Sequence, residues 1–324
     1  MKITFLGLEE WQEKHIKEKL KKHKLKFLKE INNSNIKLIK DTEILAVFIY
    51  HNVDYELVNK LQKLKAVMTM STGYDHININ ACSNIKVYNV PYYGENTVAE
   101  HTFALILALS RRIVEAVDRT REDNFKKNGL RGFDLKGKTI GIIGTGHIGQ
   151  HVIKIAKSFD MNVIACSHTT DKNLEKKLGF KYIKLNNLLE KSDIITLHCL
   201  LNEETRHIIN LNNINKIKKG AYIINTARGQ LIDTNALLYG LNNEIIAGAG
   251  LDVLEDEDEM MKEKHMHRNE SLILSEDHKI LRKHNVIITP HIAYDTKEAL
   301  MRITETTIEN INNYIKGKKK NCVN

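Results

Sequence analysis

The sequence predicts an α/β protein of two domains, each built around a parallel sheet. Three observations lead to this fold class. The chain has 324 residues, about twice the usual length of one domain. Its hydrophobic content of 42% and charged content of 27% are typical of a globular protein that buries a large core. Short apolar runs also alternate with stretches of helical spacing, which is typical of βαβ units.

The first seventy residues contain the first strands and the first clear helix. Three short apolar runs are expected to be buried strands: 2–6, 44–50 and 66–70. Between the last two runs, residues 54–64 have helical spacing with their leucines on one face. This alternation predicts a parallel sheet in the first domain.

Residues 96–118 are expected to form one helix. Thr97 and Glu100 have the spacing of a capping box at its start. The run 103–109 has no polar face, so this part of the helix should be buried between domains or between subunits.

A second alternation of strands and helices begins near residue 138. Six apolar runs are expected to be strands: 139–143, 162–165, 193–198, 221–225, 245–249 and 286–289. Helices are expected between them, for example at 148–159 and 233–241, and a long amphipathic helix at 296–316. Six strands with helical crossovers are what a complete dinucleotide-binding sheet requires.

A glycine-rich turn, GTGHIG at 144–149, follows the first strand of this second group and begins a helix. In this context a G-x-G-x-x-G pattern predicts dinucleotide binding. Gly144 permits a tight turn, Gly146 lets the backbone approach a pyrophosphate, and Gly149 lets helix and strand pack closely. The helix N-terminus, which includes His147 and Ile148, attracts negative charge.

The next strand lacks the acid that normally binds the adenosine ribose about 20 residues after the glycines. No carboxylate occurs at 165–170; Asp160 precedes the strand and Asp171 lies beyond its end. This departure bears on the choice between NAD and NADP.

Three further segments each follow a predicted strand: NTARGQLID at 225–233, GLDVLEDE at 250–257 and TPHIAY at 289–294. Ligands bind at the carboxyl ends of parallel strands. Arg228, a glutamate within 255–257 and His291 are therefore expected in one cleft. Arginine pairs bidentately with carboxylates, and a histidine beside a glutamate is a tunable acid–base pair.

Together these motifs resemble the D-2-hydroxyacid dehydrogenase family through nearly the whole chain. The segments STGYDHI at 71–77 and NVPYYGENTVAEH at 89–101 are similar to its D-lactate dehydrogenase branch, as is GTGHIGQ at 144–150. The resemblance implies two Rossmann-like domains with parallel sheets. The substrate domain would comprise 1–101 and 295–324, and the cofactor domain, 102–294, would be inserted within it.

The resemblance also implies roles for individual residues. Arg228 would hold the substrate carboxylate, His291 would exchange a proton with the substrate oxygen, and Glu257 would pair with His291. Further cofactor residues would be Ser167, Thr226 and Asp252. Substrate-binding residues would be Tyr50, Thr72, Gly73, Tyr93 and Tyr294.

The expected reaction is NAD(P)H-dependent reduction of a 2-keto acid, with pyruvate and D-lactate favoured. Ser167 stands where the family usually has the ribose-binding acid, so NADP use is permitted beside NAD. Reduction of glyoxylate or hydroxypyruvate would use the same three residues. Formate oxidation is disfavoured because that relative has Gln at the position of Glu257. A dinucleotide-sensing transcriptional corepressor remains an alternative of another class.

The expected setting is a cytoplasmic homodimer. Four widely spaced cysteines suggest reduced thiols, and no apolar run is long enough to span a membrane. The dimer would form through helix 97–118. The net charge of +9 comes from lysines spread along the chain, so nucleic-acid binding is not expected as a main role. His265 and His267 lack a convincing third metal ligand, and no metal site is expected.

Overall fold

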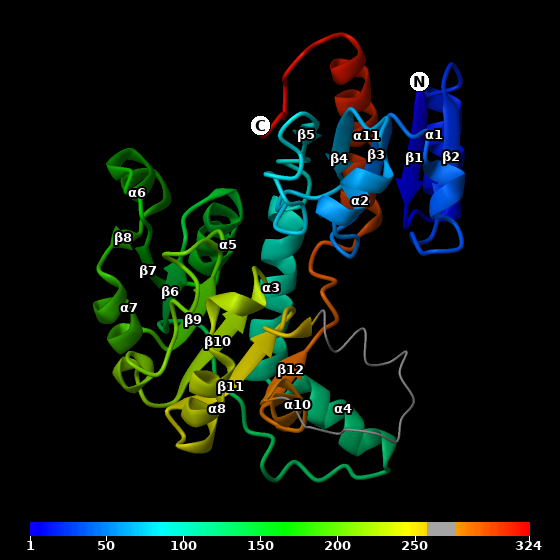
Figure 1. The fold of residues 1–324 in the computed structure, drawn as a ribbon. Coiled ribbons are helices and arrows are strands. Elements are labelled where there is room, and N and C mark those ends of the chain that lie inside the picture. The colour runs from blue at the N-terminus through cyan, green and yellow to red at the C-terminus, as the bar shows by residue number, and fades with distance from the viewer. Residues whose placement is uncertain (258–275) are drawn as a thin grey trace. The chain divides into compact units, whose positions relative to one another are not determined.

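The structure is a computed structural model that describes residues 1–257 and 276–324. The chain divides into two compact units (Figure 1). The first comprises Met1–Tyr93 and Asp295–Asn324, and the second comprises Gly94–Tyr294.

The first unit has a five-stranded parallel sheet in the order β2-β1-β3-β4-β5. Its strands are β1 (Lys2–Leu6), β2 (Lys24–Leu28), β3 (Ile44–Val47), β4 (Ala66–Thr69) and β5 (Lys86–Tyr88). Its helices are α1 (Glu10–Lys19), the 3-10 helix η1 (Ile36–Ile39), α2 (Tyr55–Lys60) and α11 (Lys297–Ile315). The long C-terminal helix α11 returns to this unit and packs against α1 and β4.

The second unit has a seven-stranded parallel sheet in the order β12-β11-β10-β9-β6-β7-β8. The strands are β6 (Thr139–Ile143), β7 (Asn162–Cys166), β8 (Lys181–Tyr182), β9 (Ile194–Leu197), β10 (Ala221–Asn225), β11 (Ile246–Leu251) and β12 (Val286–Ile288). The α-helices are α3 (Glu95–Ser110), α4 (Ile113–Arg121), α5 (His147–Ser158), α6 (Lys172–Leu178), α7 (Leu185–Lys191), α8 (Thr234–Asn242) and α10 (Glu276–Leu281). The described part of this unit also has two 3-10 helices, η2 (Ile214–Lys216) and η3 (Gly229–Leu231).

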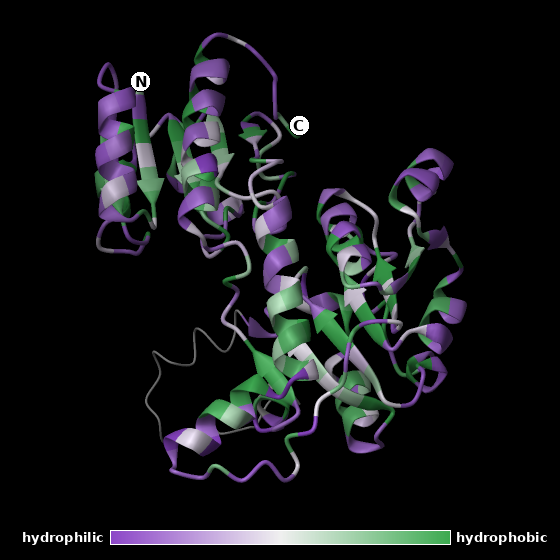
Figure 2. Ribbon diagram, turned by 180° about the vertical axis from the view of Figure 1, so that it is seen from behind, coloured by the Kyte–Doolittle hydropathy of each residue, from purple (hydrophilic) through white to green (hydrophobic). Residues whose placement is uncertain are grey.

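Two hydrophobic clusters lie on opposite faces of this second sheet. One contains buried residues of α3 and α5, and the other contains residues of α7 and α8. Figure 2 shows the strands between them mainly in the colours of hydrophobic residues. Helices on both faces make the parallel sheet a buried layer, so only its ends are available for binding.

The α/β class with two parallel sheets is confirmed, but three strands were missed. These are β2 and β5, which are the edges of the first sheet, and β8, an edge of the second. β5 and β8 have three and two residues, too few for a pattern. β2 has the sequence KLKFL, and charged lysines are common on exposed edges.

The predicted helix 96–118 is two helices, not one. α3 ends at Ser110, whose carbonyl accepts a hydrogen bond from Phe133 N, and Arg112 then adopts a left-handed conformation with φ of 50°. The expected capping box is also wrong. The cap position is Gly94, and Thr97 lies buried inside α3. None of the described helices is long and apolar enough to cross a membrane.

Candidate active site

The glycine turn lies between β6 and α5, where the sequence predicted it. Gly144 has φ of 99°, and a Cβ there would lie 2.5 Å from Cys199 N. A Cβ on Gly149 would lie 2.1 Å from Gly144 O. The fold itself therefore requires these two glycines. Gly146 is different, because a Cβ there would meet no atom within 4 Å and its φ of −66° suits any residue. Its lack of a side chain leaves open space at the N-terminus of α5, at His147 and Ile148.

The open space at Gly146 leads to a prediction. Gly146→Ala should leave the melting temperature unchanged or slightly raised, since alanine restricts the unfolded chain. The same substitution should weaken NADH binding by about tenfold, because a methyl group would block close approach of a pyrophosphate. Calorimetric titration with NADH checks this. Gly94→Ala, at another helix cap with only ordinary contact to Val98, is the matched control. Unchanged NADH affinity in Gly146→Ala would contradict the assignment.

The segment after β7 confirms that no carboxylate follows the strand directly. Gly144 N donates to Cys166 O at 2.8 Å, so Ser167 comes immediately after the residue that holds the glycine turn. Asp171 is the N-cap of α6, and its side chain accepts hydrogen bonds from Asn173 N and Leu174 N. Ser167 is thus the polar residue next to the glycine turn.

Arg228 lies on a turn that follows β10. Asn225 holds this turn at both ends, because its side chain accepts from Ala227 N at 3.0 Å and donates to Arg228 O at 2.8 Å. Thr226 is buried and its hydroxyl is 3.0 Å from that of Thr102 on α3. A Cβ on Gly229 would lie 1.9 Å from Leu254 O, so the turn packs directly on the segment after β11.

His291 and Glu257 meet as predicted, with His291 Nδ1 and Glu257 Oε1 separated by 2.9 Å. The sequence left the register of the acidic run open. The structure resolves it within the described residues, because Glu255 has other partners and Glu257 is the residue at His291. A carboxylate can only accept, so Nδ1 carries the proton in this bond. The other ring nitrogen, Nε2, is then the one suited to exchange a proton with a ligand.

Asp252 holds the turn that carries His291. It is 1% exposed, and its carboxylate accepts from Ile292 N at 2.9 Å and Ala293 N at 2.8 Å. Its main-chain carbonyl accepts from His291 N at 2.9 Å. His291 itself has φ of 54°, an unfavourable conformation for a non-glycine residue that the surrounding bonds maintain. Asp252, from the end of β11, thus fixes a turn after the neighbouring strand β12.

The candidate substrate residues are divided between the two units. Tyr294 belongs to the second unit, and its ring lies edge-on to His291 with centroids 6.4 Å apart. In the first unit, Tyr50 follows β3 and the 72–73 loop follows the adjacent strand β4. Thr72 donates its hydroxyl to Val90 O, and Ser71 donates to Gly73 O. The main-chain carbonyl of Tyr93 accepts a hydrogen bond from Nε of the Arg302 side chain.

His198 and Cys199 follow β9 beside the glycine turn, and both are half-buried. Burial lowers the pKa of His198 to about 3, so the ring is neutral near pH 7. Burial also raises the pKa of Cys199 to about 11, which keeps it a thiol. His291 is therefore a better candidate acid–base than His198.

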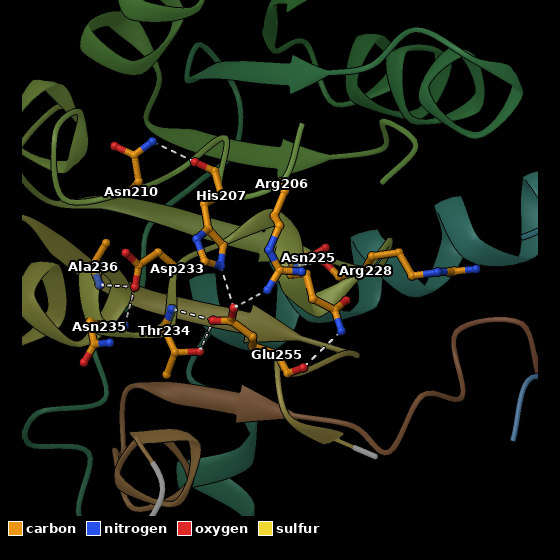
Figure 3. A network of polar contacts seen from close by, with 11 residues as sticks. Arg206, His207, Asn210, Asn225, Arg228, Asp233, Thr234, Asn235, Ala236 and Glu255 are labelled. Atoms are coloured by element: carbon orange, nitrogen blue, oxygen red, sulfur yellow. Dashed lines mark hydrogen bonds and ion pairs between the residues drawn. The ribbon is translucent and has the colours of Figure 1, made fainter. Parts of the chain in front are cut away.

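Sequence reasoning missed a polar network centred on Glu255 (Figure 3). The Glu255 carboxylate contacts His207, Thr234 and Arg206. Burial alone would raise the pKa of this carboxyl, but the bonds from His207 and Thr234 outweigh burial and hold the pKa below its ordinary value. No local pattern identifies such a network, because Glu255 is 21 to 49 residues away from these partners in sequence.

Among residues 1–257 and 276–324, no three histidine, cysteine or acidic side chains are grouped to hold a metal ion. His265 and His267 lie outside the described residues, so the expectation for them stays untested.

Comparison with known proteins finds a family model and several relatives that match the chain. Residues 103–293 match the family described as D-isomer specific 2-hydroxyacid dehydrogenase, NAD binding domain. The chain is 35% identical to D-lactate dehydrogenase of Escherichia coli over 283 residues, which are 85% of this chain and 84% of the relative. It is 36% identical to glyoxylate reductase of Thermococcus litoralis over 289 residues, covering 86% of this chain and 82% of the relative. The solved D-lactate dehydrogenase of Aquifex aeolicus, complexed with NAD and lactic acid, is 36% identical. Its structure superposes with a TM-score of 0.90 over 99% of this chain and 98% of that one.

Proposed function

The chain belongs to the family of D-isomer-specific 2-hydroxyacid dehydrogenases, and we propose that it reduces pyruvate to D-lactate. The observation that carries this proposal is the His291–Glu257 pair at 2.9 Å. Arg228 lies in the same unit, and the three residues follow β10, β11 and β12, which are neighbours in the sheet. Carboxyl ends of adjacent parallel strands are where such a sheet binds its ligand.

The second unit fits the dinucleotide that its family binds. The turn 144–149 leaves open space at Gly146, and the first N–H groups of α5 lie beside it. We assign cofactor binding to this turn, with Ser167, Thr226 and Asp252 as further contacts. NADH, when bound, supplies the hydride.

The remaining chemistry belongs to side chains of this protein. The Arg228 guanidinium matches a carboxylate with two parallel hydrogen bonds, and this fixes the orientation of the adjacent ketone. His291 donates a proton from Nε2 to the ketone oxygen, while Glu257 holds the ring through Nδ1. Thr72 and Gly73 are assigned to the substrate carboxylate. Tyr50, Tyr93 and Tyr294 are assigned to the pocket wall. On this proposal the first unit is the substrate domain and the second is the cofactor domain.

Pyruvate is one of several small 2-keto acids that this machinery can orient. Similarity to both a D-lactate dehydrogenase and a glyoxylate reductase makes glyoxylate the main alternative, with hydroxypyruvate beside it. Steady-state reduction of the three acids with NADH tests the proposal. We expect pyruvate to have the highest kcat/KM. A higher value for glyoxylate or hydroxypyruvate would assign the protein to that activity instead.

Cofactor selectivity gives another prediction. An acid at position 167 would repel the 2′-phosphate of NADPH, and serine removes that repulsion without supplying a positive clamp. We expect wild type to use NADPH within about a hundredfold of NADH, a gap of about 2.7 kcal/mol. Ser167→Asp should lower kcat/KM for NADPH by at least about tenfold while NADH is retained. If wild type rejects NADPH much more strongly, another group holds the ribose and Ser167 does not set selectivity.

We also propose a homodimer, with its surface at the C-terminal end of the predicted helix 97–118, on α4. The apolar side chains of α3, such as Phe103 and Ile106, are buried within the second unit. On α4, by contrast, Ile113, Val114 and Val117 are 50%, 46% and 40% exposed. Clustered exposed apolar residues indicate an interface. The four free cysteines fit a cytoplasmic protein.

The dimer proposal is tested by introducing charge on α4. Wild type should have twice the chain mass of 37.2 kDa in light scattering at micromolar concentration. The double variant Val114→Asp, Val117→Asp should have the single-chain mass, since two desolvated carboxylates oppose association. A monomeric wild type would refute the dimer, and a dimeric double variant would refute the α4 surface.

A further inference from the structure

We propose that Glu255 is a positioning residue that fixes the Arg228 turn relative to Glu257. This inference rests on the function proposed for Arg228 and Glu257 above. Glu255 lies two residues before Glu257, and it is bound to Gln230 and Thr234, which follow Arg228 in the chain, and to His207 (Figure 3). Figure 3 shows the Arg228 side chain extending away from Glu255, so Glu255 acts on the turn and not on the guanidinium.

The two carboxylate oxygens of Glu255 bind different segments. Oε2 accepts from Thr234 N at 3.1 Å and from the Thr234 hydroxyl at 3.0 Å, at the first residue of α8. Oε1 accepts from His207 Nε2 at 2.5 Å. The side chain of Glu255 is only 15% exposed, so water cannot readily replace these partners. One carboxylate therefore joins the start of α8 to the loop that carries His207.

Main-chain contacts complete the attachment. Gln230 donates its side-chain amide to Glu255 O at 3.1 Å, and His207 N donates to Gln230 O at 2.8 Å. Residue 230 is two positions after Arg228. The 229–230 turn also packs on Leu254 so closely that a Cβ at Gly229 has no room. These contacts hold residues 229–234, which follow Arg228, against residues 254 and 255, which precede Glu257 by two or three positions.

For this role, a side chain long enough to bind Thr234 and His207 at the same time matters more than a negative charge. Glu255→Gln keeps the length of the side chain and an oxygen that accepts from Thr234. Its amide N–H can donate to His207 once the His207 ring changes tautomer. Glu255→Asp keeps the charge but is shorter by one methylene, so it cannot span Thr234 and His207 together. A displacement of about 1 Å in a site of this kind lowers turnover by about a hundredfold.

The test compares these two variants in intact protein. Glu255→Asp should lower kcat for the preferred 2-keto acid by about a hundredfold, and Glu255→Gln by no more than about fivefold. A second readout does not need turnover. Oxamate, an unreactive pyruvate analogue, should bind the NADH complex of Glu255→Asp about tenfold more weakly than that of wild type or Glu255→Gln. NADH affinity should stay within about twofold in all three.

Asp193 provides the matched control, because it is a partly buried carboxylate that also accepts from a main-chain N–H, at Thr139, and from Lys218. Asp193→Glu should lower the melting temperature without changing kcat or oxamate affinity. The inference is overturned if Glu255→Asp retains the kcat and the oxamate affinity of wild type. It is also overturned if Glu255→Gln loses more of kcat and oxamate affinity than Glu255→Asp, which would indicate an electrostatic role. If wild type reduces no 2-keto acid, the proposed function fails, and the Glu255 comparison by oxamate binding can still be made.

Discussion

Replacing Arg228 with lysine is expected to lower kcat/KM for pyruvate by about a hundredfold or more. Lysine keeps the positive charge but presents a single point of attachment, whereas guanidinium grips a carboxylate with two parallel bonds. The orientation of the ketone toward the hydride donor is then lost together with part of the binding energy. NADH affinity should stay within about twofold, because the glycine turn and α5 are unaffected. Steady-state kinetics and calorimetric titration with NADH measure the two quantities.

Arg121→Lys is the control for this experiment, since Arg121 on α4 is 75% exposed and pairs with Asp118 on the same helix. It should behave as wild type. Near-normal kcat/KM for pyruvate in Arg228→Lys would remove Arg228 from the carboxylate site. The turn after β10 would then have a purely structural purpose.

Glu257→Gln is expected to lower kcat by about 10- to 100-fold. The Glu257 carboxylate can only accept, and at 2.9 Å from Nδ1 it holds the His291 ring with Nδ1 as the donor. Glutamine can present its amide N–H to the ring instead of its carbonyl oxygen. Nδ1 is then no longer held as the donor, and the orientation of the ring is no longer fixed. A correctly held general acid contributes roughly 10²- to 10⁴-fold, which bounds the loss.

The measurement is kcat for pyruvate at saturating NADH for both proteins. An unchanged kcat would mean that Glu257 does not hold His291 in a catalytic orientation. Glu255→Gln serves for comparison here, because it removes a carboxylate two residues away that contacts His207. Its kcat should stay within about fivefold of the wild-type value.

Central strands and amphipathic helices of this fold could be predicted from the sequence because their signals are local. All strands that are buried on both faces, such as β6 and β9, are apolar runs. The edge strands were not predicted because β2 alternates lysine with apolar residues and β8 has only two residues.

The break at Arg112 was not predicted for another reason. Phe133 N donates a hydrogen bond to Ser110 O at the end of α3, and a contact between residues so far apart leaves no local pattern in the sequence.

The candidate site divides in the same way. Arg228, Glu257 and His291 could be identified because each follows a strand and lies in a motif. The partners that hold these residues could not be identified. Asp252 binds main-chain N–H groups about forty residues away, and Glu255 binds side chains on two other loops. Such contacts exist only once the strands are arranged in the order β12-β11-β10.

Reduction of pyruvate by the purified protein with NADH, followed by chiral chromatography of the product, tests the central claim most directly. We expect each NADH consumed to yield one molecule of lactate, and we expect this lactate to be the D enantiomer. His291→Gln should abolish most of this turnover while NADH still binds. NADH binding without turnover of any 2-keto acid would contradict the account and favour a dinucleotide-sensing protein, and formation of L-lactate would contradict it equally.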